Sequence, residues 1–266
     1  MRNGEWSAVS VTTDIMGTHR DYESLIREAG EWGPWQWRMV GVMLVPSMTA
    51  SAATLSWVFT AWPGPPGCEA DHEIPGVVSD HGSMLGDLGA VCEAQWLASL
   101  LAPVFMLGML LGAPLVGHIS DRRGRRLGLL TSLTIVTVSG GLQPLLPHSL
   151  VWASTWRLVT GLGTGGILVT TFVILIEWPT ASTGTRSWRL VSALGLHLGW
   201  NLGQALLLVS ASVFSDWRYI HWAAHSVGIL AIALLLAQPE SARYLVLLAV
   251  YFLKFIQSCQ VACCSK

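Results

Sequence analysis

Six long apolar stretches follow one another along this chain, and they limit its possible folds more than any other feature. They cover residues 39–61, 94–116, 127–146, 150–176, 190–213 and 219–237. Each has about the 20 residues that a helix needs to cross roughly 30 Å of hydrocarbon. Only 12% of the residues are charged, against about 25% in an ordinary globular chain, which indicates an apolar solvent. We therefore predict an all-α, polytopic membrane protein.

This division leaves two segments outside the bundle. Residues 1–36 mix acidic and basic side chains without an apolar run, so we predict a cytoplasmic N-terminal segment before a six-span bundle over 37–245. Residues 246–266 form a tail that is first apolar and then contains cysteines. The apolar run from Tyr244 to Ile256 has only about 13 residues, which favours an interfacial or core segment over a crossing helix.

The placement of charge tests the six crossings independently, because Lys and Arg collect in cytoplasmic loops. No Lys or Arg occurs between Arg38 and Arg122, and the loop after the first stretch is acidic. The loops after the second and fourth stretches are basic. Six crossings then put both termini in the cytoplasm, and they leave only Arg157 and Arg218 of the fifteen basic residues on or near the outer side.

The five cysteines divide between the two sides of the membrane. Cys68 and Cys92 flank the acidic outer loop, where an oxidising compartment permits a disulfide worth nominally about 3 kcal/mol. Cys259, Cys263 and Cys264 lie in the predicted cytoplasmic tail. Palmitoylation is one interpretation of these three thiols, and a lack of any role is the other.

The basic turn between the second and third stretches contains the strongest motif. Its candidate gate residues are Gly117, Asp121, Arg122, Gly124, Arg125 and Arg126. The two glycines would let a tight turn pass close to a neighbouring helix, and Asp121 can pair with an arginine or with a helix N-terminus. The arginines would hold the turn in the cytoplasm. A run of arginines without this spacing of glycines and Asp121 would indicate only an anchor that keeps the loop in the cytoplasm.

A polar arc runs along the fourth stretch. At 100° per residue, Arg157, Thr160, Thr164 and Thr171 fall within about 60° of one another. An arginine in hydrocarbon costs at least a few kcal/mol unless it faces a cavity or a partner, which makes Arg157 a candidate functional residue. The alternative is that Arg157 reaches up to the outer headgroups.

Glycines on two stretches have the spacing of close helix contacts. Gly161 and Gly165 form a small-xxx-small face on the fourth stretch, directly after Arg157. Gly195, Gly199 and Gly203 lie within about 80° of arc on the fifth stretch. These faces are expected to pack against neighbouring helices.

The opposite side of the fifth stretch is polar and predicts part of a binding site. His197, Asn201 and Gln204 lie within about 60° of arc there, and their uncharged donors and acceptors could orient a small solute. Trp57 and Trp200 would offer flat surfaces for an aromatic or cationic group. Alternatively, the polar side chains only bond across helices, at about 0.6 to 2 kcal/mol each. The candidate cavity residues are Trp57, Thr164, Thr171, His197, Trp200, Asn201 and Gln204.

These motifs together resemble the organic cation and anion transporter family of the major facilitator superfamily. The basic turn is similar to the superfamily signature G-x-L-x-D-R-x-G-R-R, with Ile119 in place of Leu, and the fourth stretch is similar to R-x-x-x-G-x-G. The family itself is indicated by Glu177-Trp178, Leu202-Gly203-Gln204 and Pro239-Glu240-Ser241-Ala242-Arg243-Tyr244-Leu245. The last of these matches P-E-S-P-R-W-L except at Ala242 and Tyr244. The resemblance covers about residues 20–245.

The resemblance implies a fold and an activity. The fold would be the six-helix N-terminal bundle of a major facilitator, and the activity would be secondary transport of small organic ions by alternating access at the plasma membrane. The basic turn would act as a cytoplasmic latch. Pro239, Glu240, Ser241 and Arg243 would form a motif after the last span.

The sequence departs from the family pattern in two places. The outer loop, about residues 63–93, is shorter than in the family and contains no Asn-x-Ser/Thr sequon. After Leu245 the chain leaves the pattern, so we expect a shortened form without the C-terminal half.

Three functions agree with the sequence. The chain could transport a small organic cation or anion, it could associate with or regulate a full-length relative or act as a receptor, or it could pair with itself. The expected partners are the lipid bilayer, the organic ion and such a membrane protein, and no nucleic acid. No cofactor or metal is indicated. An enzyme is not expected, because no span carries a carboxylate pair, a metal cluster or an activated nucleophile.

Overall fold

The computed structural model describes residues 34–60, 84, 99–145, 149–177 and 185–238. All of the secondary structure in these residues is helical, as the sequence predicts. The helices are α2 (Pro34–Thr60), α5 (Leu101–Arg123), α6 (Arg125–Leu142), α7 (Leu150–Glu177), α8 (Thr185–Val213) and α9 (Trp217–Leu236).

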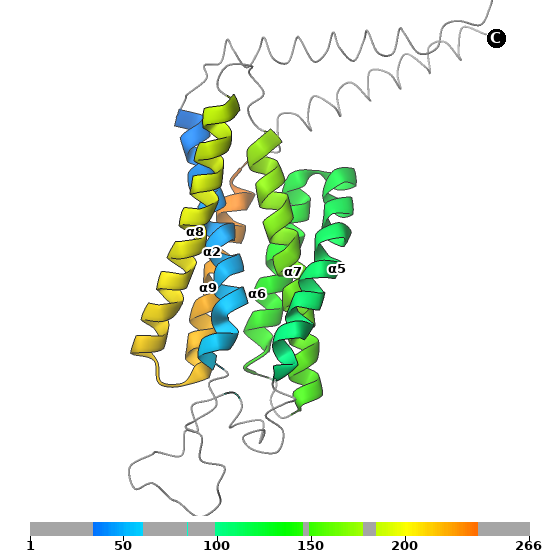
Figure 1. The fold of residues 1–266 in the computed structure, drawn as a ribbon, viewed down its shortest axis with the longest axis vertical. Helices are drawn as coiled ribbons and strands as arrows, with labels where there is room; N and C mark the ends of the chain where they lie inside the picture. Colours follow the sequence, from blue (N-terminus) through cyan, green and yellow to red (C-terminus); the bar gives the residue numbers. More distant parts are fainter. Residues whose placement is uncertain (1–33, 61–83, 85–98, 146–148, 178–184, 239–266) are drawn as a thin grey trace, which may run out of the picture.

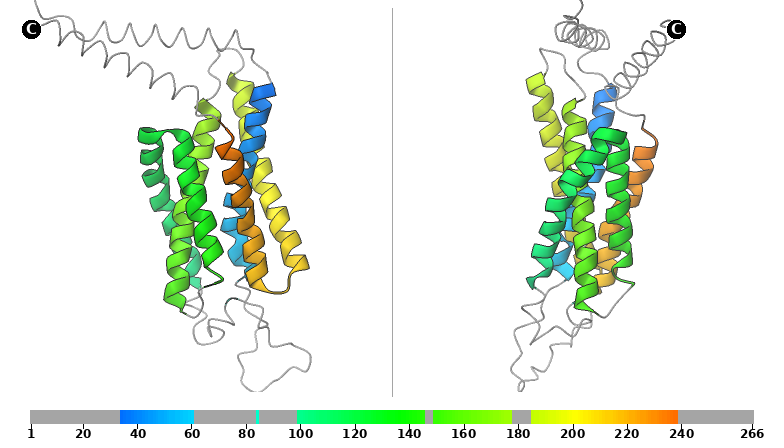
Figure 2. Two further views of the ribbon diagram at one scale, coloured as in Figure 1. Left: turned by 180° about the vertical axis from the view of Figure 1, so that it is seen from behind. Right: turned by 90° about the vertical axis from the view of Figure 1, so that its right-hand side faces the viewer.

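The helices run roughly side by side and form two groups of three (Figures 1 and 2). In one group, α7 packs against α5 and α6. In the other, α2 packs against α8 and α9. Contacts of α6 with α9 and of α2 with α7 join the groups, so the first and fourth apolar stretches meet at the centre of the bundle.

Glycines set the closest helix contacts. A Cβ atom added to Gly112 of α5 would overlap the backbone of Leu162 on α7, and one added to Gly161 would overlap the backbone of Phe105. On the other side, a Cβ atom on Gly199 or Gly203 of α8 would run into the backbone of α2. These glycines therefore act as packing faces, because small residues let helix backbones approach in lipid.

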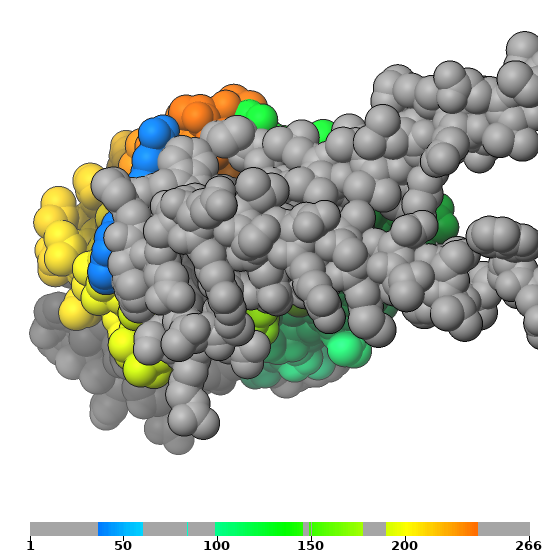
Figure 3. Space-filling model, turned by 90° about the horizontal axis from the view of Figure 1, so that it is seen from above, coloured from blue at the N-terminus to red at the C-terminus, as the bar shows by residue number. Residues whose placement is uncertain are grey.

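The outward sides of α5 and α8 are mainly apolar. These two helices lie at opposite edges of the bundle (Figures 1 and 3). Their exposed large apolar side chains include Leu107, Leu110 and Leu115 on α5, and Leu190, Leu194, Leu198 and Leu208 on α8. A mainly apolar exterior is typical of a helix bundle whose solvent is lipid.

Four helices are long and apolar enough to cross a membrane on length and composition alone. They are α2 from Trp37, α5, α7 from Val151, and α9. The other two described helices do not reach the hydropathy of a spanning helix. Helix α6 carries two arginines at its start, and α8 carries three polar residues at its middle. The crossing by all six apolar stretches stays a prediction. The chain is a multi-pass integral membrane protein.

The basic motif after the second stretch is helical except at Gly124. Helix α5 extends through Arg123, and the turn into α6 is the single residue Gly124, with φ 104° and ψ 147°. Only glycine adopts such a φ without strain. Gly117 lies inside α5, and a Cβ atom there would meet nothing within 4 Å. The tight turn that we expected from two glycines thus depends on Gly124 alone.

Candidate functional site

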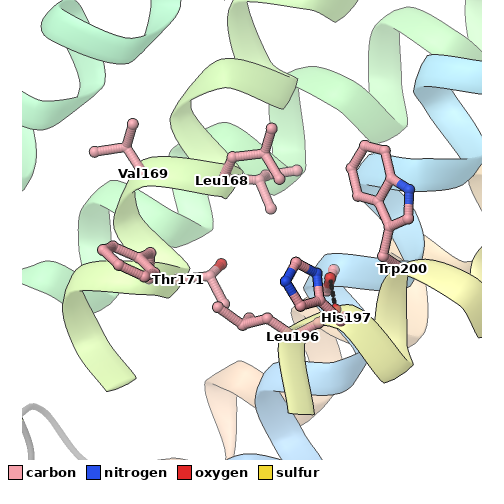
Figure 4. A pocket seen from close by; sticks show the side chains of 9 residues that line it. Leu168, Val169, Thr171, Leu196, His197 and Trp200 are labelled. Atoms are coloured by element: carbon pink, nitrogen blue, oxygen red, sulfur yellow. Dashed lines mark hydrogen bonds between the residues drawn. The ribbon is translucent and has the colours of Figure 1, made fainter. Parts of the chain in front are cut away.

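A pocket of about 470 Å³ lies between α2, α7 and α8 (Figure 4). Its volume is in the range of small-molecule sites. The side chains of Leu168 on α7 and of His197 and Trp200 on α8 face the same space. The lining residues are Ser47, Ile167, Leu168, Val169, Thr171, Phe172, Leu196, His197 and Trp200.

The lining is mainly apolar and has few polar groups. Ser47 already donates its hydroxyl hydrogen to the carbonyl oxygen of Leu196, at 2.8 Å. The hydroxyl of Thr171 is buried without a hydrogen-bond partner in the described parts of the chain, whereas His197 is exposed. No charged side chain is among the lining residues that the structure describes. The pocket can therefore hold an apolar or aromatic solute and orient it through Thr171 and His197.

The structure brings together three of the seven candidate cavity residues, namely Thr171, His197 and Trp200. Thr164 lies outside the pocket, because it faces the interior of the bundle and donates to the carbonyl of Thr160 at 2.8 Å. Trp57 lies against Arg157 instead. Asn201 is exposed and Gln204 is half-buried, and neither lines the pocket.

Sequence reasoning missed most of the lining, because it is apolar. Ile167, Leu168 and Phe172 have no feature that separates them from other apolar residues of a spanning helix. Ser47 has none either, since α2 carries many hydroxyl residues. Thr171 is a partial signal for this wall of the pocket, because it lies near these residues on α7 and belongs to the polar arc of the fourth stretch.

Arg157 is inside the bundle and does not reach the outer headgroups. Its side chain is 2% exposed. One terminal nitrogen donates to the hydroxyl of Ser56 at 3.4 Å and to the carbonyl of Ala53 at 3.5 Å, both on α2. The guanidinium also lies over the rings of Phe105, at 4.7 Å, and Trp57, at 5.7 Å. Of our two interpretations, the buried arginine that faces a partner agrees with this geometry.

The cytoplasmic end of the bundle contains an ion network around Arg125. Arg125 donates to both carboxylate oxygens of Glu177 at the end of α7, from Nε at 3.1 Å and from Nη2 at 2.9 Å. It also pairs with Asp121, one turn earlier on α5. Burial lowers the pKa of Arg125, but the hydrogen bonds and charges of Glu177 and Asp121 outweigh this effect and raise that pKa. The guanidinium stays charged and joins α5, α6 and α7.

Arg126 extends this network to α9. Its Nε donates to the carbonyl of Leu235 at 3.2 Å, and its Nη2 donates to the carbonyl of Leu236 at 2.7 Å. These carbonyls end α9, and that of Leu235 also accepts from the backbone N–H of Gln238 at 3.1 Å. A cation at the C-terminus of a helix is favourable. Arg122, by contrast, is exposed. The motif thus fixes four helix ends within the bundle.

Several predicted site residues lie outside the described residues. They are Cys68 and Cys92 of the proposed disulfide, Pro239, Glu240, Ser241 and Arg243 of the motif after the last span, and the tail cysteines Cys259, Cys263 and Cys264.

The chain matches the model of a known protein family. The profile of the family "Sugar (and other) transporter" matches residues 68–250.

Curated relatives are similar over part of the chain. Solute carrier family 22 member 12 of Rattus norvegicus is 32% identical over 156 residues, which are 59% of this chain and 27% of that protein. The organic cation transporter protein of Drosophila melanogaster is 28% identical over 165 residues, which are 62% of this chain and 29% of that protein. Organic anion transporter 3 of Mus musculus is 30% identical over 157 residues, which are 59% of this chain and 28% of that protein. The chain therefore matches less than a third of the length of these relatives.

Among solved structures, the fold is similar to a bacterial sugar transporter. The partially occluded, inward-open xylose transporter XylE of E. coli aligns with a TM-score of 0.61 at 17% identity. The alignment covers 80% of this chain and 51% of that one. At this identity the likeness concerns the fold alone.

Proposed function

This chain belongs to the sugar (and other) transporter family of the major facilitator superfamily, and from that premise we propose that it acts in the secondary transport of small organic ions across the plasma membrane. Its curated relatives include proteins named for organic cations and for organic anions. The observation that carries the proposal is the pocket between α2, α7 and α8, which lies inside a bundle with the fold of this superfamily.

Alternating access explains why such a pocket lies between helices. Transporters of this type bind solute between two helical units, and one unit rocks against the other around the site. In our proposal the pocket is the part of such a site that one unit contributes. The six helices here correspond to one such unit, since they align with about half of the xylose transporter. In our proposal the pocket holds the apolar part of the ion, while His197 and Trp200 contact its polar or charged end.

The basic network sets the orientation that we propose. The Asp121 turn and Arg126 lie at the same end of the bundle as the ends of α7 and α9. Since basic residues collect on the cytoplasmic side, we place this end in the cytoplasm, together with both termini. The pocket would then exchange solute with the cytoplasm when the partner unit opens on that side.

An uptake measurement tests this function. Cells expressing the full chain are given a labelled tetraalkylammonium ion or a labelled aromatic carboxylate, and uptake is compared with that of mock-transfected cells. We expect uptake of one of the two classes above the mock control. Uptake at background for both classes, with the protein present at the cell surface, rejects autonomous transport.

Two tryptophan variants connect the uptake to the pocket. We expect Trp200→Ala to lower uptake by about two- to thirtyfold, because an aromatic contact with a cation is worth about 0.5–2 kcal/mol. Trp222→Ala is the matched control, since Trp222 lies on α9 away from the pocket and is 38% exposed. Equal effects of the two substitutions would argue against binding at this pocket.

A second candidate function is association with another membrane protein without transport. It is favoured by the exposed His197 and Asn201 on α8, because polar side chains that face lipid are costly and a partner could cover them. Co-purification with a full-length relative, compared with an unrelated six-span protein, tests this function. Equal recovery of both proteins would reject it. Self-association and a receptor role belong to the same class of hypothesis.

A further inference from the structure

One face of α5 takes no part in the pocket and ends in an arginine of the basic turn. At 100° per residue, five exposed side chains fall within about 80° of arc on this helix. We name them the leucine–arginine face: Leu107, Leu111, Leu115, His118 and Arg122. The buried residues of α5 lie on its other side, and the helix stands at an edge of the bundle (Figure 1). The face therefore points away from the packed interior.

The arginines of the basic turn differ in whether the protein uses their charge. Arg125 and Arg126 bind the ends of α7 and α9. The guanidinium groups of Arg122 and Arg123 are exposed, and they have no hydrogen-bond or ion-pair partner in the parts of the chain that the structure describes. The carboxylate of Asp121 is paired with Arg125. Two positive charges beside the leucines are thus free to bind an anion from outside these parts.

The length of the face matches one leaflet of a bilayer. The helix rises by about 12 Å from Leu107 to Leu115, and Arg122 lies about 10 Å further along the axis. The whole face measures about 22 Å, which is half of the roughly 40–45 Å that a bilayer spans with its headgroups. When Arg122 is at the depth of the phosphates, the three leucines are therefore at the depth of the acyl chains.

The charge of the face selects the kind of lipid. A zwitterionic headgroup has an ammonium group beside its phosphate, whereas an anionic headgroup brings net negative charge to the arginines, and basic residues at the membrane surface attract such lipids. A guanidinium binds phosphate oxygens through two parallel N–H donors. His118, one turn before Arg122, has a ring N–H donor in either tautomer. The order of apolar and basic residues along α5 is thus the order of chain and headgroup in an anionic phospholipid.

We propose that the leucine–arginine face binds one anionic phospholipid. An acyl chain lies along the three leucines, and the phosphate lies at Arg122, with His118 and Arg123 beside it. The bound lipid holds the end of α5 in its leaflet and stabilises the folded bundle. This site is separate from the pocket between α2, α7 and α8, so it does not depend on the proposed transport function.

Thermal unfolding of the purified full chain in a neutral detergent tests the site. Three compounds are titrated separately: phosphatidylglycerol, phosphatidylcholine with the same acyl chains, and glycerophosphoglycerol, which is the anionic headgroup without chains. We expect the Tm to rise saturably with phosphatidylglycerol, because a ligand that binds only the folded state stabilises it. The other two compounds should change the Tm little.

Three results of this titration overturn the proposal. An equal rise with phosphatidylcholine would show that the face does not select charge. An equal rise with glycerophosphoglycerol would show a site for a free anion instead of a lipid. A Tm that depends on protein concentration but on none of the three compounds would show that a second copy of the chain covers the face.

Two arginine variants connect the effect to the face. We expect Arg122→Gln to weaken the apparent affinity for phosphatidylglycerol by about fivefold, which is the contribution of one arginine near an anionic membrane surface. Arg218→Gln is the matched control, because it removes the same charge at the start of α9, at the opposite end of that helix from the carbonyls that bind Arg126. The control should bind phosphatidylglycerol like the unmodified chain. An unchanged affinity in Arg122→Gln, or equal losses in the two variants, overturns the proposal.

Discussion

At the scale of single residues, three arginines of this chain have three different environments. Arg157 is buried in the bundle among aromatic rings. Arg125 forms a two-pronged ion pair with Glu177, and Arg126 caps the last carbonyls of α9. The guanidinium group is the same in each case, so the surrounding helices decide whether it lies among aromatic rings, links helix ends through an ion pair or caps a helix C-terminus.

The Arg125–Glu177 pair gives a stability prediction. We expect Glu177→Gln to lower the free energy of unfolding by about 1.5–3 kcal/mol, because hydrogen bonds to a charged partner are lost at a site that is about 20% exposed. Asp121→Asn is the control, since its side chain is 62% exposed and an exposed ion pair is worth little. Thermal unfolding in nanodiscs would show the larger decrease for Glu177→Gln. A larger decrease for Asp121→Asn would contradict the ranking.

The sequence could place Arg157 on a polar arc but could not decide where its side chain ends. The periodicity of one helix relates Arg157 to Thr160 and Thr164, and the structure shows both of these threonines buried. The partners of Arg157 come from α2 and α5. Their positions depend on how the helices pack, which no single-helix pattern contains.

At the scale of helices, glycine contacts define the pairing of α5 with α7. Gly108 and Gly112 of α5 approach the backbone of α7, and Gly161 and Gly165 of α7 approach that of α5. The spacing of four residues repeats on both helices, so each pair forms a continuous groove. This contact joins the helix of the basic turn to the helix of Arg157.

The groove predicts opposite effects of one substitution at two sites on α5. Gly112→Ala should destabilise the chain by about 1–3 kcal/mol, because its Cβ atom would overlap Leu162. Gly117→Ala should be neutral or stabilising by up to about 1 kcal/mol, since open space surrounds Gly117 and alanine favours the helix. The midpoint of thermal unfolding checks both variants. Similar changes at the two sites would show that the groove is not a close contact.

The extents of the helices could largely be predicted, but their ends could not. Every apolar stretch overlaps one helix, because a chain in lipid must satisfy its backbone hydrogen bonds within the helix. Helix α5 extends beyond its apolar stretch to Arg123, and α8 begins at Thr185, before its own stretch. Polar residues continue these helices beyond the apolar stretches. Hydropathy predicts the part of a helix that lies in lipid, whereas the backbone hydrogen bonds of the helix continue past it.

At the scale of the whole molecule, the fold could be predicted and the pocket only in part. The resemblance to the major facilitator superfamily is confirmed by the family match and by the fold of the xylose transporter. The pocket takes its walls from α2, α7 and α8, and most of its lining is apolar. Polar and tryptophan side chains were our only guides, so they indicated Thr171, His197 and Trp200 but none of the aliphatic wall.

The central claim is that this bundle crosses the membrane with its basic turn in the cytoplasm. An Arg122→Cys variant places a thiol on an exposed position of that turn. Labelling with a membrane-impermeant maleimide is measured in intact and in permeabilised cells, and labelling of the unmodified chain is subtracted. We predict additional labelling only after permeabilisation. Additional labelling in intact cells would put the turn outside and contradict both the orientation and the transport model built on it.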